Sequence, residues 1–507
     1  MSSPLPPGWI EAPLGSLAEI GAGGPAPQDK SCFSPDGTPF VRVQDLGRLG
    51  SKALISETAD RLNESGVKTS RLRLIPAGAV LFTKSGMSTL LNQRAILGKD
   101  SYIVSHVGYA IPYDGVLSHW LYWALKLIDF GPLTQATTLP SLQLSKVKEV
   151  GIRLAPVSEQ RRIVAEIEKH FTRLEAAVEA LKRARANLRR YRASVLKAAC
   201  EGRLVPTEAE LARAEGRDYE PADKLLARIL KERHARWEAD QLAKMRAVRK
   251  PPKDDRWNAK YKEPASPDTT NLPCLPEGWV WAVLGCLADV HLGKMLSPKA
   301  YETGLQQLPY LRNENVQWGR IDTIDVKMMG FNQQELERYC VETNHLLVCE
   351  GGEAGRAAVY AGPSGEFMYQ KALHRVRPIA GLVSPYFIQF CFWHYVVSGV
   401  VIPRPSETTI QHLPLERMVV LPIPLPPLAE QRRIVAEVER RLSVIDELVA
   451  AVEANLKRAE RLGQAILKRA FEGRLVPQDP SDEPASVLLE RIRAERRGGS
   501  QTRPGST

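Results

Sequence analysis

The sequence contains no long apolar run. No stretch approaches the roughly eighteen uninterrupted apolar residues that a membrane-spanning helix needs. Residues 1–11 also lack the basic start and the apolar segment of a secretory signal. We therefore expect a cytoplasmic protein that makes no contact with a membrane.

The sequence also lacks the usual signatures of metal sites, disulfide frameworks and catalytic centres. Its seven cysteines include no C-x-x-C pair, so we expect buried thiols rather than a zinc site or disulfides. There is no G-x-x-x-x-G-K-[ST] phosphate loop, no H-E-x-x-H helix and no G-x-S-x-G elbow. The tetrapeptides Asn-Pro-Pro-Tyr and Asp-Pro-Pro-Tyr, with which amino-methyltransferases hold a flipped base, are absent as well. The pattern favours a protein that is not an enzyme and binds no metal.

What the sequence has in excess is positive charge. Its 69 lysines and arginines against 58 acidic residues give a formal net charge of +11. Basic side chains that neutralise phosphates release condensed counterions, so this charge favours binding to nucleic acids. Many basic proteins bind no nucleic acid, however, and charge alone does not decide the question.

The chain of 507 residues consists of two similar half-chains. Four motifs occur once in each half: Leu-Pro-x-Gly-Trp at 5–9 and 275–279, Glu-Gln-Arg-Arg-Ile-Val-Ala-Glu at 159–166 and 430–437, Glu-Gly-Arg-Leu-Val-Pro at 201–206 and 472–477, and Glu-Pro-Ala-x-x-Leu-Leu at 220–226 and 483–489. A period of about 270 residues is far longer than the units of solenoid repeats. The repeat therefore indicates duplication of a whole module.

Each half contains a long stretch typical of a coiled-coil helix. Residues 158–199 include neither glycine nor proline, and apolar side chains recur there every seven residues with further apolar positions between them. We expect this helix and its copy to pair antiparallel about a pseudo-twofold axis, although the same pattern also fits a coiled coil that serves only dimerisation. The predicted pairing residues are Ile167, Phe171, Leu174, Val178, Leu181, Leu188, Val195, Val438, Leu442, Ile445, Val449, Val452, Leu456 and Ile466.

The remaining segments favour globular modules of mixed α/β structure. Short apolar runs broken by glycine and proline indicate strands and turns, and the runs at 117–128 and 385–397 indicate brief helices. The expected fold class is α+β, with two globular domains separated by the two long helices. The expected boundaries are 1–155 and 271–425 for the globular domains, 156–206 and 426–477 for the helices, 207–270 for a charged helical segment and linker, and 478–507 for a short helix and a disordered tail.

Polar and basic side chains gather where the two globular modules differ most. Arginine and lysine can pair with guanine edges, glutamine and asparagine with adenine, and glutamate with cytosine, so these side chains are able to read the major groove. Solvated loops contain the same residue types, and most such side chains face solvent or phosphate. The candidate DNA-binding residues are Arg42, Gln44, Lys84, Ser85, Gln93, Arg94, Arg312, Asn313, Asn315, Glu350, Arg356, Gln370, Lys371 and His374.

Taken together, these motifs resemble those of the DNA-specificity subunits of type I restriction-modification systems. The resemblance covers essentially the whole chain to about residue 497. Leu-Pro-x-Gly-Trp opens each target-recognition domain, and Pro-Val-Ser-Glu-Gln at 156–160 and Pro-Leu-Ala-Glu-Gln at 427–431 open the two helices. One departure is Met-Ser-Thr-Leu at 87–90, where the second copy has the small-residue turn Glu-Ala-Gly-Arg at 353–356.

The resemblance implies a function and a set of partners. Each recognition domain would read one half of a split, asymmetric site in double-stranded DNA, with a spacer measured by the paired helices. Two methyltransferase subunits would bind the helices, and restriction subunits would join them for cleavage. S-adenosylmethionine, ATP and magnesium would belong to those partners, so this chain would need no cofactor. The subunit interface would include Gln160, Arg161, Arg162, Gln431, Arg432 and Arg433.

The sequence is also compatible with another class of protein. A structural coiled-coil adaptor without sequence preference would share the repeat, the helices and the charge. It would bind DNA weakly and with uniform salt sensitivity, whereas a specificity subunit would prefer one sequence strongly over competitor DNA.

Overall fold

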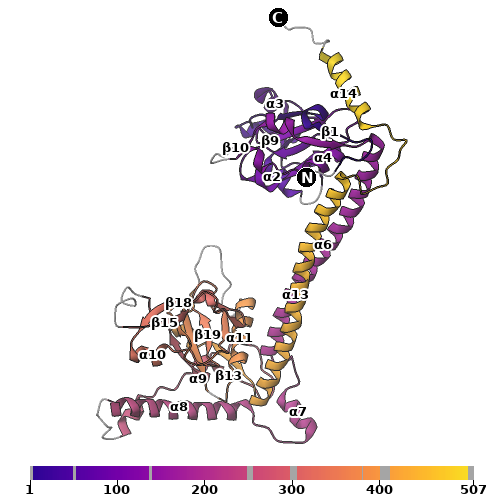
Figure 1. The fold of residues 1–507 in the computed structure, drawn as a ribbon. Coiled ribbons are helices and arrows are strands. Elements are labelled where there is room, and N and C mark those ends of the chain that lie inside the picture. The colour runs from indigo at the N-terminus through magenta and orange to yellow at the C-terminus, as the bar shows by residue number, and fades with distance from the viewer. Residues whose placement is uncertain are drawn as a thin grey trace. The chain divides into compact units, whose positions relative to one another are not determined.

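The structure, a computed structural model, describes residues 4–49, 53–135, 140–247, 255–296, 305–379, 381–399 and 412–500. It divides into two compact units: Met1–Arg183 with Val452–Thr507, and Ala184–Ala451. The first unit therefore combines both ends of the sequence, drawn in indigo and in yellow in Figure 1. The tail predicted to be disordered lies, from residue 501 on, outside the described residues. In the parts of the chain that the structure describes, no helix is long and apolar enough to cross a membrane.

The first β-domain, residues 4–154, is built on one larger sheet and one smaller sheet. The larger sheet has the strand order β2 (Ala18–Ala22), β9 (Val107–Pro112), β6 (Val80–Thr83), β7 (Arg94–Leu97) and β4 (Leu54–Ile55). The smaller has the order β5 (Asp60–Leu62), β3 (Phe33–Val41) and β8 (Tyr102–Ile103), and two-stranded pairs join β1 (Ile10–Pro13) to β12 (Gly151–Leu154) and β10 (Thr134–Gln135) to β11 (Ser141–Leu142). Its helices are α1 (Leu14–Leu17), α2 (Val43–Arg48), α3 (Glu64–Ser70), α4 (Ser118–Leu127) and α5 (Leu144–Glu149), with short 3₁₀ turns at Lys30–Cys32, Met87–Leu91 and Gly131–Leu133.

The second β-domain, within residues 271–425, repeats this arrangement. Its larger sheet has the order β14 (Ala288–Leu292), β22 (Leu373–Pro378), β19 (Leu346–Cys349) and β20 (Ala357–Val359), and its smaller sheet the order β18 (Lys327–Phe331), β15 (Gln306–Leu311) and β21 (Met368–Tyr369). Two-stranded pairs join β13 (Val280–Val283) to β23 (Pro422–Leu425) and β16 (Val316–Gln317) to β17 (Arg320–Ile321). Its helices are α9 (Leu284–Leu287), α10 (Gln333–Tyr339), α11 (Pro385–Ser398) and α12 (Leu415–Val419), with a 3₁₀ turn at Asn313–Asn315.

One apolar helix packs on the larger sheet of each β-domain. Helix α4 packs on β6, β7 and β9, and helix α11 packs on β19 and β20. Local sequence sets the ends of α11: the Ser384 hydroxyl accepts the Phe387 N–H, Pro385 occupies the first turn, and Gly399 ends the helix with a φ of 69°. The side chains of Phe387, Phe390 and Phe392 are completely or almost completely buried. These helices therefore supply much of the core of each domain.

Two helices of 44 residues, α6 (Val157–Cys200) and α13 (Leu428–Phe471), contribute to both units. In the first unit Gly463 of α13 lies against Phe171 and Leu174 of α6. In the second unit Arg192 of α6 pairs with Asp446 of α13. Because later residues of α6 meet earlier residues of α13, the packing within each unit is antiparallel. The predicted α+β class, with two β-rich domains and two packed long helices, is confirmed.

The residues of the predicted pairing stripes lie on the packed faces of these helices. Seven are buried: Ile167, Val195, Val438, Leu442, Ile445, Val452 and Ile466. The other seven, which are half-buried, are Phe171, Leu174, Val178, Leu181, Leu188, Val449 and Leu456. Val195, Leu442 and Ile445 belong to the same apolar cluster as the core of the second β-domain.

Each long helix leads into segments that pack on the β-domain of the other half-chain. Helices α7 (Glu208–Glu215) and α8 (Ala222–Ala247) follow α6, and α8 packs on α9 of the second β-domain. Helix α14 (Ala485–Ser500) follows α13 and packs on α1 of the first β-domain. The two half-chains thus exchange their last segments.

The aromatic residues of the predicted charged linker pack on α8. Trp257, in the short 3₁₀ segment Asp255–Lys260, stacks on Trp237 with ring centroids 5.8 Å apart. The Tyr261 ring lies 4.4 Å from that of His234. Residues 248–254 of that linker lie outside the described residues.

The helix packing can be tested with two neighbouring residues of α13. Ile445→Ala should lower the free energy of unfolding by about 2–5 kcal/mol, because Ile445 is 2% exposed and its truncation leaves a cavity. The matched control Val444→Ala should change it by less than about 0.5 kcal/mol, because Val444 is 47% exposed. Urea unfolding followed by tryptophan fluorescence measures both. Equal losses would contradict the packing described here.

Candidate nucleic-acid interface

A buried carboxylate begins each long helix and binds the tryptophan of the repeated opening motif. The Trp9 indole N–H donates to Glu159 Oε2 at 2.9 Å, and the Trp279 indole N–H donates to Glu430 Oε1 at the same distance. Burial raises the pKa of both carboxyls, although these hydrogen bonds act in the opposite direction. Burial therefore disfavours the ionised form of each carboxyl, and the indole N–H groups favour it.

The same carboxylates bind the exit segment of the other half-chain. Glu159 Oε1 accepts from the Gln478 side chain at 2.8 Å, and Glu430 Oε2 accepts from the Glu208 N–H at 2.8 Å. We call these two places the junctions. Each one joins a β-domain, the start of its own helix and the segment that follows the other helix.

Arginines and backbone groups add further links at the junctions. Arg162 pairs with Asp482 at 2.7 Å, and Arg433 pairs with Glu208 at 2.5 Å. The Ala485 N–H donates to the Gly8 carbonyl, and the Ala222 N–H donates to the Gly278 carbonyl, both at 2.8 Å. Gly8 and Gly278 have φ values of 77° and 86°, which explains why the opening motif carries glycine at that place.

The glutamine beside each buried glutamate fixes the apolar helix of its β-domain. Gln160 Oε1 accepts the Leu117 N–H at 3.1 Å and its amide donates to the Ala155 carbonyl at 2.9 Å. Gln431 binds the Ser384 N–H and the Pro426 carbonyl in the same way. Both glutamines are completely buried.

This geometry changes the list of predicted interface residues. Gln160 and Gln431 are enclosed within their own units, and Arg162 and Arg433 are engaged with acidic side chains of the same chain. Arg161 and Arg432 are exposed. We therefore keep only these last two as candidates for contact with another subunit.

In each β-domain the loops that follow four strands meet at one edge. In the first β-domain they follow β2, β3, β6 and β8, and backbone hydrogen bonds join Gly24 to Ile103, Val104 to Val41 and Lys84 to His106. In the second they follow β14, β15, β19 and β21, and the matching bonds join Lys294 to Tyr369, Gln370 to Leu311 and Glu350 to Ala372. We call these the first and second recognition edges.

Five of the fourteen candidate DNA-binding residues have polar side chains available at these edges. They are at least partly exposed and make no ion pair or side-chain hydrogen bond with another described residue: Gln44 and Lys84 in the first domain, and Glu350, Gln370 and Lys371 in the second. Ser85 lies beside Lys84, and its hydroxyl is 2.6 Å from His106 Nδ1. The edges thus bring together candidates that are 40 residues apart in the first domain and 20 or 21 apart in the second.

Three other candidates lie in the interior and are not proposed as base contacts. Arg94 is 2% exposed, lies over the Phe130 ring, and has its pKa lowered to about 9 by burial. Asn315 caps the turn after β15 by accepting the Arg312 N–H. His374 is completely buried and binds the Leu413 carbonyl through Nε2 at 2.8 Å.

The remaining candidates are held by contacts within their own domain. Arg42 pairs with Asp60, Arg312 with Asp325 at 2.8 Å, and Arg356 with Glu353 at 3.2 Å. The Asn313 amide donates to the Gly351 carbonyl at 3.0 Å. Gln93 is half-buried beside Gly47. The matching positions of Arg42 and Arg312 are therefore explained by ion pairs inside each domain.

The recognition edges also include polar residues that sequence reasoning missed. His106 is exposed beside Ser85, and Lys294 of the second edge donates to the Gly330 carbonyl and pairs with Glu335. No local pattern marks either one. Strand pairing brings them to the edge, and only an alignment of the two halves by strand would have found them.

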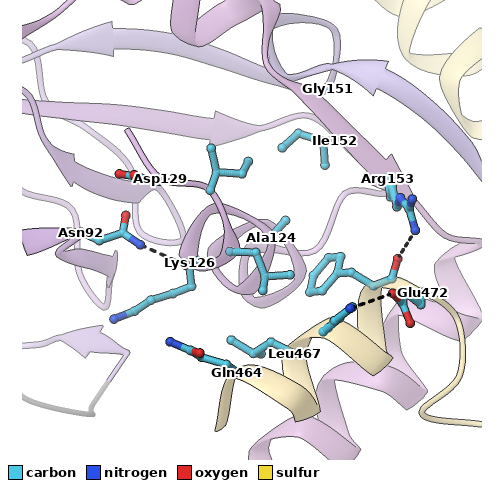
Figure 2. A pocket seen from close by; sticks show the side chains of 14 residues that line it. Asn92, Ala124, Lys126, Asp129, Gly151, Ile152, Arg153, Gln464, Leu467 and Glu472 are labelled. Atoms are coloured by element: carbon cyan, nitrogen blue, oxygen red, sulfur yellow. Dashed lines mark hydrogen bonds and ion pairs between the residues drawn. The ribbon is translucent and has the colours of Figure 1, made fainter. Parts of the chain in front are cut away.

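A cavity of about 810 Å³ lies in the first unit between β12, the end of α4 and the last turns of α13. Figure 2 shows the Arg153 guanidinium reaching the end of α13, where Nη1 donates to the Phe471 carbonyl at 3.1 Å, and the pair formed by Lys468 and Glu472. Arg153 is thus a further link between the first β-domain and the second half-chain. No group of three or more His, Cys, Asp or Glu that could hold a metal occurs among the described residues.

Comparisons with known proteins converge on one family. Residues 6–182 match the family model of the type I restriction modification DNA specificity domain. The EcoKI specificity subunit of Escherichia coli K12 is 21% identical over 518 residues, covering 97% of this chain and 96% of that protein. The EcoDI specificity subunit of Escherichia coli is 22% identical over 508 residues, with the same coverage.

Two solved structures share the fold. A chain from a structure on complex assembly and conformational transition of a type I R-M system is similar with a TM-score of 0.63 and 18% identity, covering 93% of this chain and 100% of that chain. The HsdS subunit from Thermoanaerobacter tengcongensis is similar with a TM-score of 0.50 and 19% identity, covering 93% and 98%.

The junction hydrogen bond can be tested by removing its donor. Trp279→Phe should lower the free energy of unfolding by about 1–3 kcal/mol, because a buried carboxylate oxygen loses its partner. The ionised carboxylate depends on the indole more than the protonated form does, so the penalty should be larger at neutral pH than in mildly acidic buffer.

Trp281→Phe is the matched control for this measurement. Its indole hydrogen bond, to the Pro273 carbonyl, is exposed, so the variant should unfold nearly as the parent does at every pH. A Trp279→Phe penalty that does not change with pH would contradict the role assigned to the carboxylate.

Proposed function

The chain belongs to the family of DNA specificity subunits of type I restriction-modification systems, and we propose that it binds a split, asymmetric DNA site through its two β-domains. In such complexes this is the non-catalytic subunit, and it carries no cofactor itself. Residues 1–155 and 271–425 are the two target-recognition domains of the proposal. The two long helices set the spacing between the half-sites.

One observation carries the proposal of an asymmetric site. The two recognition edges have matching backbone hydrogen bonds, yet they present different side chains: Lys84 and Ser85 on the first, and Glu350, Gln370 and Lys371 on the second. Different donors and acceptors read different base pairs in the major groove. Two domains of the same architecture would therefore recognise two unlike half-sites.

The partners proposed for the chain follow from its family. Two methyltransferase subunits bind the helices, with Arg161 and Arg432 in their contacts, and restriction subunits join the complex for cleavage. S-adenosylmethionine, ATP and magnesium belong to those subunits. The complex acts on double-stranded DNA in the cytoplasm.

Mapping of methylated adenine across the genome tests this function. Cells that express the chain with a methyltransferase subunit of the same system should carry N6-methyladenine in one split, asymmetric motif. A strain that lacks only this chain should lose that motif. A motif that persists in the second strain, or DNA binding without sequence preference, would favour the coiled-coil adaptor instead.

The subunit contacts can be tested at the two exposed arginines. Arg161→Ala combined with Arg432→Ala should weaken binding of the methyltransferase subunit about tenfold or more, because arginine is enriched among the few interface residues whose truncation costs about 2 kcal/mol or more. The control is Lys68→Ala on α3, whose side chain is 81% exposed and which should leave binding unchanged. Unchanged affinity in the double variant, measured by analytical ultracentrifugation, would remove these arginines from the interface.

A further inference from the structure

Lys84 and Glu350 occupy the same place in the two β-domains. Each is the first residue after an inner strand of the larger sheet, β6 or β19. The Lys84 N–H donates to the His106 carbonyl at 2.8 Å, and the Glu350 N–H donates to the Ala372 carbonyl at 2.9 Å. Their carbonyls accept from Leu142 and Leu413, at 2.8 and 2.7 Å. The backbone of the two residues is thus fixed on both sides by the same bonds.

Only the side chains differ at this place, and they carry opposite charges. Both are partly exposed, and neither makes an ion pair or a hydrogen bond with another side chain in the described parts of the chain. His374, whose pKa the Glu350 charge raises, is completely buried, and burial lowers that pKa more strongly. Among the described residues, Glu350 thus has no direct ion-pair partner on a surface proposed to meet DNA.

A carboxylate at such a surface has few favourable contacts. Phosphate oxygens repel it, and so do the acceptor atoms O6 and N7 of guanine and O4 of thymine. What it can accept in the major groove is a hydrogen bond from an exocyclic amino group, and the characteristic partner of glutamate is N4 of cytosine. Lysine, by contrast, gains from either a phosphate or a guanine edge. The sign of the charge thus makes base reading far more specific for Glu350 than for Lys84.

The neighbouring turn supplies compensating charge. Lys371 is exposed in the turn between β21 and β22, and the next residue, Ala372, accepts the Glu350 backbone bond. An ammonium group there can hold a phosphate beside the base pair that the carboxylate reads. Two loops of the second edge that are joined by a backbone hydrogen bond therefore carry both groups. The Lys371 ammonium can donate to a phosphate, and the Glu350 carboxylate can accept a hydrogen bond from a base.

We propose that Glu350 is a specificity-determining residue that selects a cytosine in the half-site read by the second β-domain. The inference rests on the proposed function, and it adds the identity of one base and the atom that reads it. Lys84, fixed in the same way in the first β-domain, takes no part in that choice.

Methylation mapping of the whole complex tests the inference at the level of single bases. With the wild-type chain, the half-site of the second domain should contain a cytosine that is required for methylation. Glu350→Gln should lower the preference for that cytosine about tenfold or more and leave the other half-site unchanged, since an amide favours adenine. Glu350→Asp, which keeps the carboxylate, should retain cytosine with weaker methylation, and it gives a second measurement if the first variant accumulates poorly.

Lys84→Gln is the matched control, because it changes the equivalent position of the other domain. It should leave the cytosine preference intact. An unchanged preference in Glu350→Gln, or a uniform loss of methylation at all sites with the same motif, would overturn the inference while leaving the proposed function standing. Absence of any split motif with the wild-type chain would instead refute the proposed function.

Discussion

The buried carboxylate at the start of each long helix is the interaction on which the rest of the structure depends. A carboxylate in the interior is stable only when hydrogen-bond donors surround it. At Glu159 and Glu430 these donors come from two sources: the tryptophan of the helix's own half-chain, and the exit segment of the other half-chain. Neither half-chain alone supplies the full set, so the charge makes each half dependent on the other.

At the recognition edges the backbone is fixed, whereas the side chains are free to vary. Backbone hydrogen bonds hold the loops of each edge in matching positions, whatever side chains they carry. A duplicated domain can therefore change the residues after its strands without losing its frame. Lys84 and Glu350 differ completely in chemistry, yet both have the same two backbone bonds.

The sequence predicted the repeat, the α+β class and the long helices, because each leaves a local signal such as a repeated motif or a heptad. It could not predict which motifs meet. Leu-Pro-x-Gly-Trp at 5–9 contacts Glu-Pro-Ala at 483–485 of the other half, and no spacing within one half reveals this exchange. The sequence also could not predict which single polar residues are buried. Arg94 and Lys84 look alike in the sequence, but one lies over the Phe130 ring in the core and the other after the end of a strand.

The exchange of exit segments also bears on the order in which the protein forms during synthesis. The second unit is one continuous stretch, 184–451, whereas the first unit needs both ends of the chain. A ribosome that has passed residue 451 has released everything required for the second unit. The first β-domain is synthesised earliest but at that point lacks three sets of contacts. These are the hydrogen bonds from Gln478 and from the Ala485 N–H, and the packing of Leu488 and Ile492 in its core. The domain translated first is therefore the last to be completed, and a nascent chain leaves the surface around Trp9 uncovered until its end is made.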